Sequence, residues 1–204
     1  MTTFRHTDVD VLVRDRVYDG YFQVDRYRLR HRTYAGGWTE PLLREVFERG
    51  AAAAVLPYDP IRDEVVLIEQ FRPGAFAAGD PHPWLVEIVA GIIGGGETPE
   101  GVAHREAMEE AAVPFTALEP IGGMYLSAGA MSEYVHMFIG RCDAAAAGGI
   151  HGLVHEGEDI RVMVLPAEQA LAELWAGRIR TAPAYAALAW LAARRGELRR
   201  RWRD

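Results

Sequence analysis

The stretch that decides the fold is Gly91-Ile-Ile-Gly-Gly-Gly-Glu97-Thr-Pro-Glu-Gly-Val-Ala-His-Arg105-Glu106-Ala-Met-Glu109-Glu110-Ala-Ala112-Val113. A glycine-rich turn leads into a segment that starts with Thr98 and Pro99. A hydroxyl N-cap followed by proline at the first helical position is typical of a helix start. The pattern therefore predicts a helix that runs from this point to about Ala111.

Three acidic residues of that helix share one part of its surface. Glu106, Glu109 and Glu110 lie three or four positions apart or side by side, so their carboxylates project from adjoining parts of the helix. Like charges at this spacing repel each other unless a cation lies between them, and hard oxygen ligands suit Mg²⁺ or Mn²⁺. Taken alone, Arg105–Glu110 would more often be a solvated acidic helix face.

The whole stretch resembles the Nudix box, in which Gly is followed after five residues by Glu, and after seven more by Arg-Glu-apolar-any-Glu-Glu-any-Gly-apolar. The positions that match in register are Gly91, Glu97, Arg105, Glu106, Ala107, Glu109, Glu110 and Val113. Ala112 departs from the pattern, because the family has glycine there. A left-handed alanine costs about 1–2 kcal/mol, so we expect either a different helix end or strain that is carried elsewhere.

Composition restricts the class of protein. A chain of 204 residues, half of them hydrophobic, suits one domain with a buried core, or one domain with a small appendage. A net charge of −7 argues against a nucleic-acid binder, although all 22 basic residues are arginine. Cys142 is the only cysteine, which excludes an intramolecular disulfide and fits a cytoplasmic setting. No apolar signal core or membrane span is expected.

Residues 9–49 alternate in a strand-like way and predict a small antiparallel sheet. Further strands are expected at 51–57, 64–71, 84–90, 120–126, 133–141 and 160–165, and helices at 167–176 and 182–198. Residues 144–158, rich in alanine and glycine, are expected to form a mobile loop.

Beyond the box, residues 20–195 are similar to the ADP-ribose pyrophosphatase branch of the Nudix hydrolases. The segments that carry this resemblance are 44–50, 66–72, 83–91 and 149–162. It implies an α/β fold: a Nudix α/β/α sandwich on a mixed sheet over residues 49–204, with residues 1–48 as a small N-terminal antiparallel β domain that forms a homodimer. That branch has Ser-Pro-Gly where this chain has Ser127-Ala-Gly, so GDP-sugar pyrophosphatases stay open as an alternative.

The resemblance also implies residue roles. Glu106 and Glu110, with the carbonyl of Ala90 and often Glu109, would bind the metal, while Arg105 would orient these acids or pair with Glu109 along the helix. In the loop, Glu156 would be the general base and Glu158 its support. Glutamates in surface loops more often serve only to keep a protein soluble. Substrate contacts would come from Arg44, Arg49, Arg72 and Glu133, and from Tyr21 or Phe22, unless these aromatics are core residues.

The implied reaction is hydrolysis of ADP-ribose to AMP and ribose 5-phosphate with Mg²⁺, for which Mn²⁺ can substitute. One alternative is the same chemistry on GDP-mannose or another nucleoside diphosphate sugar. The other is a non-catalytic nucleotide-sensing Nudix domain. That alternative is disfavoured because the acids are all present and no DNA-binding segment is visible.

Overall fold

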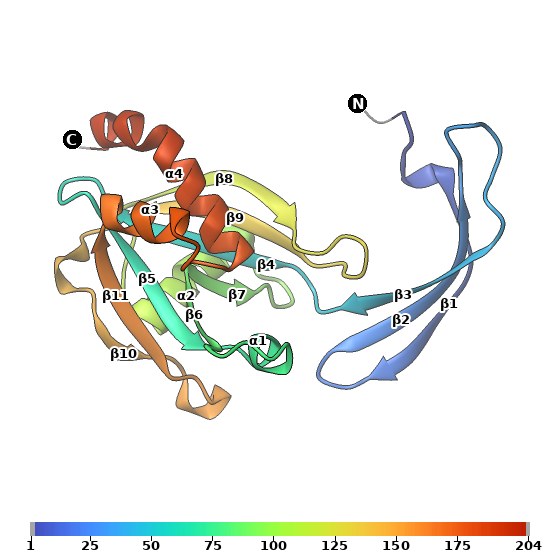
Figure 1. Cartoon of the computed structure of the whole chain (residues 1–204), viewed down its shortest axis with the longest axis horizontal. Helices are drawn as coiled ribbons and strands as arrows, with labels where there is room; N and C mark the ends of the chain where they lie inside the picture. The colour runs from blue at the N-terminus through green and yellow to red at the C-terminus, as the bar shows by residue number, and fades with distance from the viewer. Residues whose placement is uncertain (1–2, 203–204) are drawn as a thin grey trace. The chain divides into compact units, whose positions relative to one another are not determined.

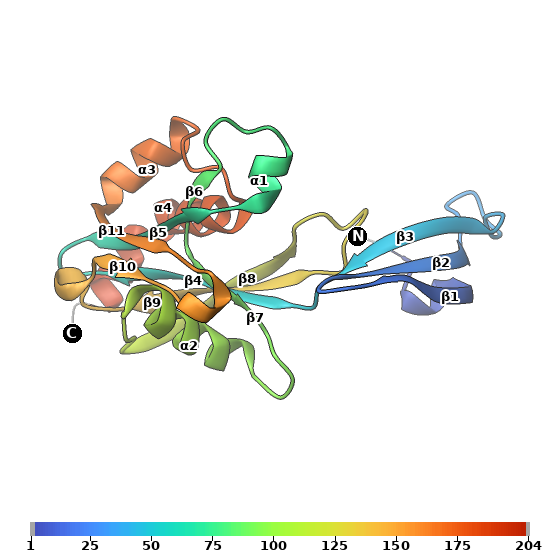
Figure 2. The same ribbon diagram turned by 90° about the horizontal axis from the view of Figure 1, so that it is seen from below.

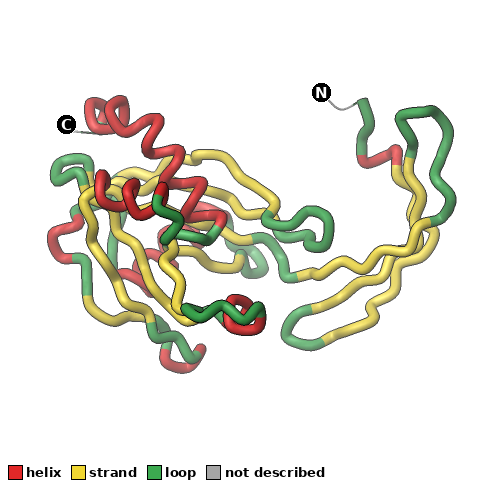
Figure 3. Tube along the Cα trace, viewed as in Figure 1, coloured by secondary structure: helices red, strands yellow, loops and turns green. Residues whose placement is uncertain are grey.

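The computed structural model describes residues 3–202, and the chain divides into two compact units. Unit 1 comprises residues 1–50 and 125–134, and unit 2 comprises residues 51–124 and 135–204. The second segment of unit 1 is tied to the first by backbone hydrogen bonds, from Phe47 N to Ala130 O at 2.8 Å and from Ser132 N to Phe47 O at 3.2 Å. Figure 3 shows helices, strands and loops along the trace.

Unit 1 is built on a three-stranded antiparallel sheet in the order β1-β2-β3 (Figure 1). Its strands are β1 (Val9–Asp19), β2 (Gln23–His31) and β3 (Leu42–Glu48), and a 3₁₀ turn, η1 (His6–Asp8), precedes them. The pairing of β1 with β2 continues, through two register shifts, to Asp19 opposite Gln23.

One carboxylate of this sheet is almost fully buried. Asp25 is 1% exposed and accepts hydrogen bonds from Arg14 Nε at 2.9 Å and from Arg16 Nε at 2.8 Å. Buried charges in proteins are stable only when they are paired in this way. The hydrogen bonds from Arg16 and Arg14 lower the pKa of Asp25 to about 2.

Unit 2 is built on a mixed sheet in the order β10-β11-β5-β4-β9-β8, with β6 paired to β5 and β7 to β4. Strand β4 pairs in parallel with β9 and antiparallel with β5 and β7, which makes the sheet mixed. The strands are β4 (Ala52–Asp59), β5 (Glu64–Phe71), β6 (Trp84–Glu87), β7 (Val89–Ile92), β8 (Ala117–Tyr125), β9 (Tyr134–Arg141), β10 (Gly149–His151) and β11 (Ile160–Pro166).

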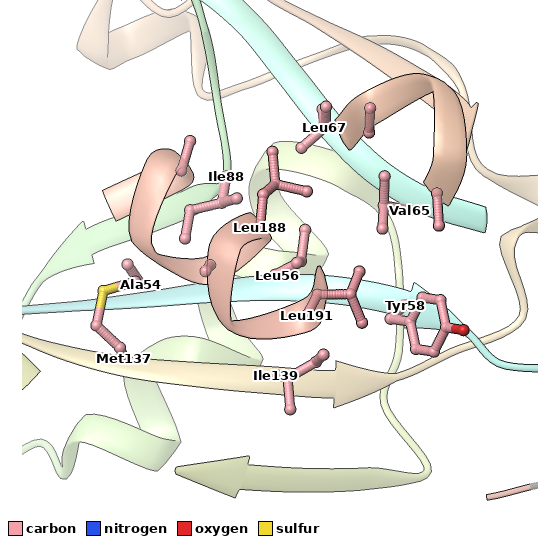
Figure 4. Packing of buried hydrophobic residues seen from close by; sticks show 14 of the residues in the cluster. Ala54, Leu56, Tyr58, Val65, Leu67, Ile88, Met137, Ile139, Leu188 and Leu191 are labelled. Atoms are coloured by element: carbon pink, nitrogen blue, oxygen red, sulfur yellow. The ribbon is translucent and has the colours of Figure 1, made fainter. Parts of the chain in front are cut away.

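Helices cover both faces of this sheet. Figure 2 shows α2 (Pro99–Ala111) on one face and α3 (Ala167–Trp175) and α4 (Ala182–Arg201) on the other. Strand β4 is buried on both sides, because Ala53 and Val55 pack towards α2 while Ala54 and Leu56 pack towards α3 and α4. Figure 4 shows this second core at close range; its members there include Ala54, Leu56, Tyr58, Val65, Leu67, Ile88, Met137, Ile139, Leu188 and Leu191. The α/β class and the mixed sheet expected from the sequence are confirmed.

The structure corrects three expectations about local structure. The single strand expected over residues 84–90 is two strands, because the chain passes at Ile88 from the edge of β5 to the edge of β4. A short helix, α1 (Pro73–Ala77), was not expected. Residues 144–158 contain β10, which pairs with β11, and two 3₁₀ turns, η2 (Ala144–Ala146) and η3 (Val154–Glu156), so this segment is largely structured.

Helix α2 ends on a left-handed alanine. Ala112 has φ 52° and ψ 35°, and Val113 N donates to Ala107 O at 3.0 Å, which is the helix-closing pattern that glycine usually permits. The family geometry is therefore kept without the family glycine, and Ala112 itself carries the strain. Val113 is buried in the core under α2, so this ending is anchored by packing.

Among residues 3–202, no helix is both long enough and apolar enough to cross a membrane.

Candidate active site

The glycine turn before α2 is held by the first residues of the helix. Thr98 is the N-cap and its Oγ1 accepts from Gly101 N at 3.1 Å, as its hydroxyl predicts. Glu97 accepts from Gly94 N at 2.9 Å, which closes the turn on itself. The start of α2, and with it the position of its acidic face, is thereby fixed.

Arg105 links the acids of this segment. Its Nε donates to Glu97 Oε1 at 2.9 Å, and its Nη1 donates both to Glu106 Oε1 at 2.9 Å and to Glu109 Oε2 at 2.8 Å. The hydrogen bond with Glu97, together with the charges of Glu106 and Glu109, raises the pKa of Arg105 above its usual value. Both roles considered for Arg105 are thus present: it pairs with Glu109 along the helix, and it gathers the other acids.

Glu110 lies at the base of the site. Its side chain is in the protein interior, the residue being 2% exposed, and Oε2 accepts from Ala90 N at 3.0 Å. Burial raises the pKa of Glu110 to about 8, against the effect of that hydrogen bond, and the charge of Glu106 adds to the rise. Burial likewise raises the pKa of Glu106. Two neighbouring carboxyls that resist ionisation are stabilised as carboxylates when a cation binds between them.

Gly91 makes room for Glu106. A Cβ atom added at Gly91 would meet Glu106 Oε1 at 1.7 Å, so the side chain lies directly against the backbone of β7. Ala90 precedes this glycine, and its N–H is already bound to Glu110. Two glutamate side chains of α2 therefore converge on the two consecutive residues Ala90 and Gly91.

These oxygen donors suit a hard divalent cation in chemistry and in burial. In residues 3–202, no group of three or more His, Cys, Asp or Glu side chains is arranged so that it could hold a metal ion. In this arrangement the guanidinium of Arg105 holds Glu106 and Glu109 by hydrogen bonds. A cation would therefore compete with Arg105 for these carboxylates.

Arg72 lies beside the acids of α2. Its Nε and Nη2 reach Glu87 Oε2 at 2.8 and 2.6 Å. Burial opposes the charge of Arg72, but the carboxylates of Glu87, Glu110 and Glu158 hold its pKa above the usual value. The segment after β5 thus brings the positively charged guanidinium of Arg72 to the site, and its planar fork of N–H donors is suited to phosphate.

The loop before β11 places its two glutamates differently. Glu158 Oε2 accepts from Leu153 N at 2.9 Å, and its charge acts on Arg72, Glu106 and Glu110. Glu156 has a side chain that is 56% exposed, and its Oε1 lies 3.8 Å from His155 Nε2. The charge of Glu158 therefore reaches the acids of α2, whereas the side chain of Glu156 is exposed.

The remaining candidates lie in unit 1. Arg49 Nε is 3.3 Å from Glu133 Oε1, and its guanidinium lies 5.6 Å from the ring centre of Phe22. Glu133 is buried, whereas Tyr21 is 87% exposed and packs edge-on against Phe22. The guanidinium of Arg44, on β3, donates to the neighbouring Leu43 O at 2.7 Å.

The structure therefore brings the candidates together in two groups. The group in unit 2 contains Ala90, Arg72, Arg105, Glu106, Glu109, Glu110 and Glu158. The group in unit 1 contains Arg49 and Glu133. Sequence reasoning missed Glu87, whose pairing with Arg72 depends on the register of β6 with β5.

Known proteins resemble this chain in sequence and in fold. The NUDIX domain pattern matches residues 48–188. The ADP-ribose pyrophosphatase of Escherichia coli (strain K12) is 45% identical over 200 residues, covering 98% of this chain and 95% of that protein. The ADP-ribose pyrophosphatase of Haemophilus influenzae is 39% identical over 202 residues, covering 98% and 93%.

A GDP-mannose pyrophosphatase of Cronobacter sakazakii is more distant, at 35% identity over 171 residues, covering 84% of this chain and 88% of that protein. Among solved structures, an ADP compounds hydrolase superposes with a TM-score of 0.69 at 17% identity, covering 97% of each chain, which supports the fold alone. The box residues, the helix they occupy and the full-length relatives agree, and the chain belongs to the NUDIX family as a pyrophosphatase.

Proposed function

We propose that this protein hydrolyses the diphosphate bond of ADP-ribose and releases AMP and ribose 5-phosphate. The observation that carries the proposal is the 45% identity, over 98% of the chain, to a protein named for this activity. Diphosphate hydrolysis requires neutralisation of charge on the phosphoryl oxygens, which the arginine after β5 and a divalent cation held by the acids of α2 would supply.

The cofactor we propose is Mg²⁺, with Mn²⁺ able to substitute. Glu106, Glu109 and Glu110, with the Ala90 carbonyl, would hold it, because burial raises the pKa of Glu106 and of Glu110 and a bound cation would stabilise both as carboxylates. When bound, such a cation polarises phosphoryl oxygens and lowers the pKa of water. Arg105 then keeps its hydrogen bonds to Glu97 and holds the start of α2 in place.

Glu156 is the proposed general base, and Glu158 its support. A base must come within hydrogen-bond distance of the water whose proton it takes. Glu156 is exposed in the present conformation, so the proposal requires its 3₁₀ turn, η3, to close over bound substrate. Glu158 already anchors the loop at Leu153 N.

Arg72 is proposed to bind the diphosphate, and Arg44, Arg49, Glu133 and Tyr21 to bind the rest of the nucleotide. Residues 1–48 are proposed to form the interface of a homodimer. The small sheet of unit 1 exposes several apolar side chains, which another protein surface would cover. These are Val9, Val11, Leu12, Val13, Val17, Tyr18 and Leu43. A cytoplasmic location stays a prediction of the sequence.

The experiment that tests the function is turnover of a substrate panel with Mg²⁺: ADP-ribose, GDP-mannose, NADH and diadenosine polyphosphates. We expect the highest kcat/KM on ADP-ribose and no turnover in excess chelator, with recovery on adding Mg²⁺ or Mn²⁺. A preference for GDP-mannose would favour the second candidate, which the relative of 35% identity supports. Tight binding of ADP-ribose without cleavage would favour the sensing domain, and undiminished turnover in chelator would exclude the metal mechanism.

The dimer is tested separately by the mass of the protein in solution at micromolar concentration. We expect twice the mass of the 22.6 kDa chain. A fully active monomer would contradict the proposed role of residues 1–48.

A further inference from the structure

Gln70 carries a buried hydrogen-bond donor that nothing in the structure uses. The residue lies in β5 and is 6% exposed, and its side-chain Nε2 has no partner among residues 3–202. The other two buried atoms of this kind belong to Arg49 and Glu133, which already have proposed substrate roles. Native proteins contain few such orphan groups, and each needs an explanation.

Strand β5 places Gln70 two residues before Arg72, the residue proposed to bind the diphosphate. Side chains alternate along β5, so Ile68, Gln70 and Arg72 share the face that packs towards α2. Arg72 continues the antiparallel pairing of β5 with β6 by one residue, because its backbone N–H donates to Pro83 O at 2.8 Å. Gln70 therefore lies between the last core residue of this face and the arginine.

The same register places Gln70 next to the partner of that arginine. Glu87 on β6 is directly opposite Ile68, which makes it the diagonal cross-strand neighbour of Gln70 on the same face. Diagonal pairs in antiparallel strands are within reach of long side chains. The amide of Gln70 and the carboxylate of Glu87 are thus a donor and an acceptor at neighbouring positions.

Glu87 depends on Arg72 in the present structure. The Arg72 guanidinium contacts Glu87 Oε2 through both Nε and Nη2, and the Glu87 side chain is only 12% exposed. When a diphosphate takes a share of the guanidinium, Glu87 loses part of this pairing while it stays largely buried. A buried carboxylate in that position requires another donor.

We propose that Gln70 is a positioning residue of the substrate site: its side-chain amide donates to Glu87 while Arg72 binds the diphosphate. The Gln70–Glu87 hydrogen bond holds the carboxylate in place, and the carboxylate in turn fixes the direction of the Arg72 fork. The inference rests on the proposed function, because Arg72 is a phosphate ligand only if a diphosphate binds there.

The test is Gln70→Met, which keeps the length of the side chain and removes its donors. Its control is Leu67→Met, a volume-conserving change on the same strand whose side chain faces α3 and α4 instead. We expect Gln70→Met to raise KM for ADP-ribose about tenfold, the effect of one hydrogen bond to a charged group, with kcat within about threefold. The thermal unfolding midpoint should stay the same or rise, because the donor that is removed has no partner among residues 3–202.

A double variant identifies the residue through which Gln70 acts. If Gln70 acts through Glu87, then Gln70→Met added to Glu87→Gln should raise KM no further than Glu87→Gln alone. Gln70→Glu, which removes the donors and adds a like charge beside Glu87, should raise KM more than Gln70→Met does. Additive effects in the double variant would overturn the coupling.

The inference as a whole is overturned if Gln70→Met leaves KM within about twofold of the parent, or if it lowers the unfolding midpoint far more than Leu67→Met does. Failure of the proposed function gives a different result. If the parent cleaves GDP-mannose instead, the same KM ratios are measured on that substrate. If it binds ADP-ribose without cleaving it, the dissociation constant replaces KM.

Discussion

Glu106 occupies the space that a side chain on Gly91 would fill. The carboxylate lies so close to the backbone of β7 that a Cβ atom at Gly91 would be 1.7 Å from Glu106 Oε1. Cδ and Cγ of the same side chain would be at 2.1 and 2.5 Å, so the whole end of the Glu106 side chain would have to move to relieve the overlap. The glycine at the start of the box is therefore a condition for the position of the glutamate fifteen residues later.

Gly91→Ala should consequently disable the site without unfolding the protein. The added methyl group must push Glu106 away from Ala90 and Gly91, and misplacement by about 1 Å can cost on the order of 10²-fold in rate. The loss of activity is measured as kcat/KM for ADP-ribose, and far-ultraviolet circular dichroism checks that the variant is folded. Gly95→Ala is the matched control in the same turn, because nothing lies within 4 Å of a Cβ there. Equal activity of the two variants would refute the steric argument.

Glu156→Gln should keep substrate binding nearly intact and slow turnover by roughly 10²–10⁴-fold, the range for loss of a general base. Glu158→Gln should be milder, because its proposed role is to support the loop at Leu153. Single-turnover rates and dissociation constants of both variants separate chemistry from binding. The present conformation places Glu158 nearer the acids of α2. If turnover is largely lost in Glu158→Gln but nearly unchanged in Glu156→Gln, the roles of the two glutamates must be exchanged.

Ala112→Gly should stabilise the protein. Ala112 holds φ 52°, where an alanine costs about 1–2 kcal/mol and glycine does not, although glycine adds freedom to the unfolded chain. We expect the free energy of unfolding to rise by about 1 kcal/mol, measured by urea denaturation. Ala111→Gly, one position earlier in helical and buried backbone, should have the opposite sign. A destabilised Ala112→Gly variant would show that the strain is absent.

The stability of unit 1 should depend on acid through Asp25. The pKa of this carboxyl is lowered from 3.8 to about 2 by hydrogen bonds from Arg16 and Arg14. Its contribution is therefore complete above pH 3.8 and is lost as the pH falls towards 2. Amide hydrogen exchange in β1 and β2 should be faster in Asp25→Asn than in the parent at pH 5, and the difference should shrink near pH 2. A difference that is the same at both pH values would contradict this assignment.

Local patterns were sufficient to predict the parts of the fold that local chemistry determines. The cap at Thr98, the glycine turn and the acidic face of α2 follow from residue types at fixed spacing, and strand β5 was predicted with its observed bounds. The break at Ile88 could not be predicted, because residues 84–90 are uniformly apolar apart from Glu87 and the break depends on which strand each half joins.

The candidate site was predictable to the same extent. Spacing identifies which acids share a face of α2, but not that Arg105 draws two of them together or that Glu110 is buried. Those facts depend on packing between α2 and β7. Gln70 and Glu87 were missed for a related reason: neither belongs to a motif, and their relation exists only in the register of β5 with β6.

Arg105 has a consequence for the way the protein is made. Its guanidinium offsets part of the charge of the acidic face, through hydrogen bonds of 2.8–2.9 Å to three carboxylates, so α2 has an internal counter-ion before any metal binds. The newly synthesised chain can complete its fold with an internal counter-ion and acquire the cation afterwards. Starvation for divalent metal would then leave a pool of folded, dormant protein that recovers on resupply without new synthesis.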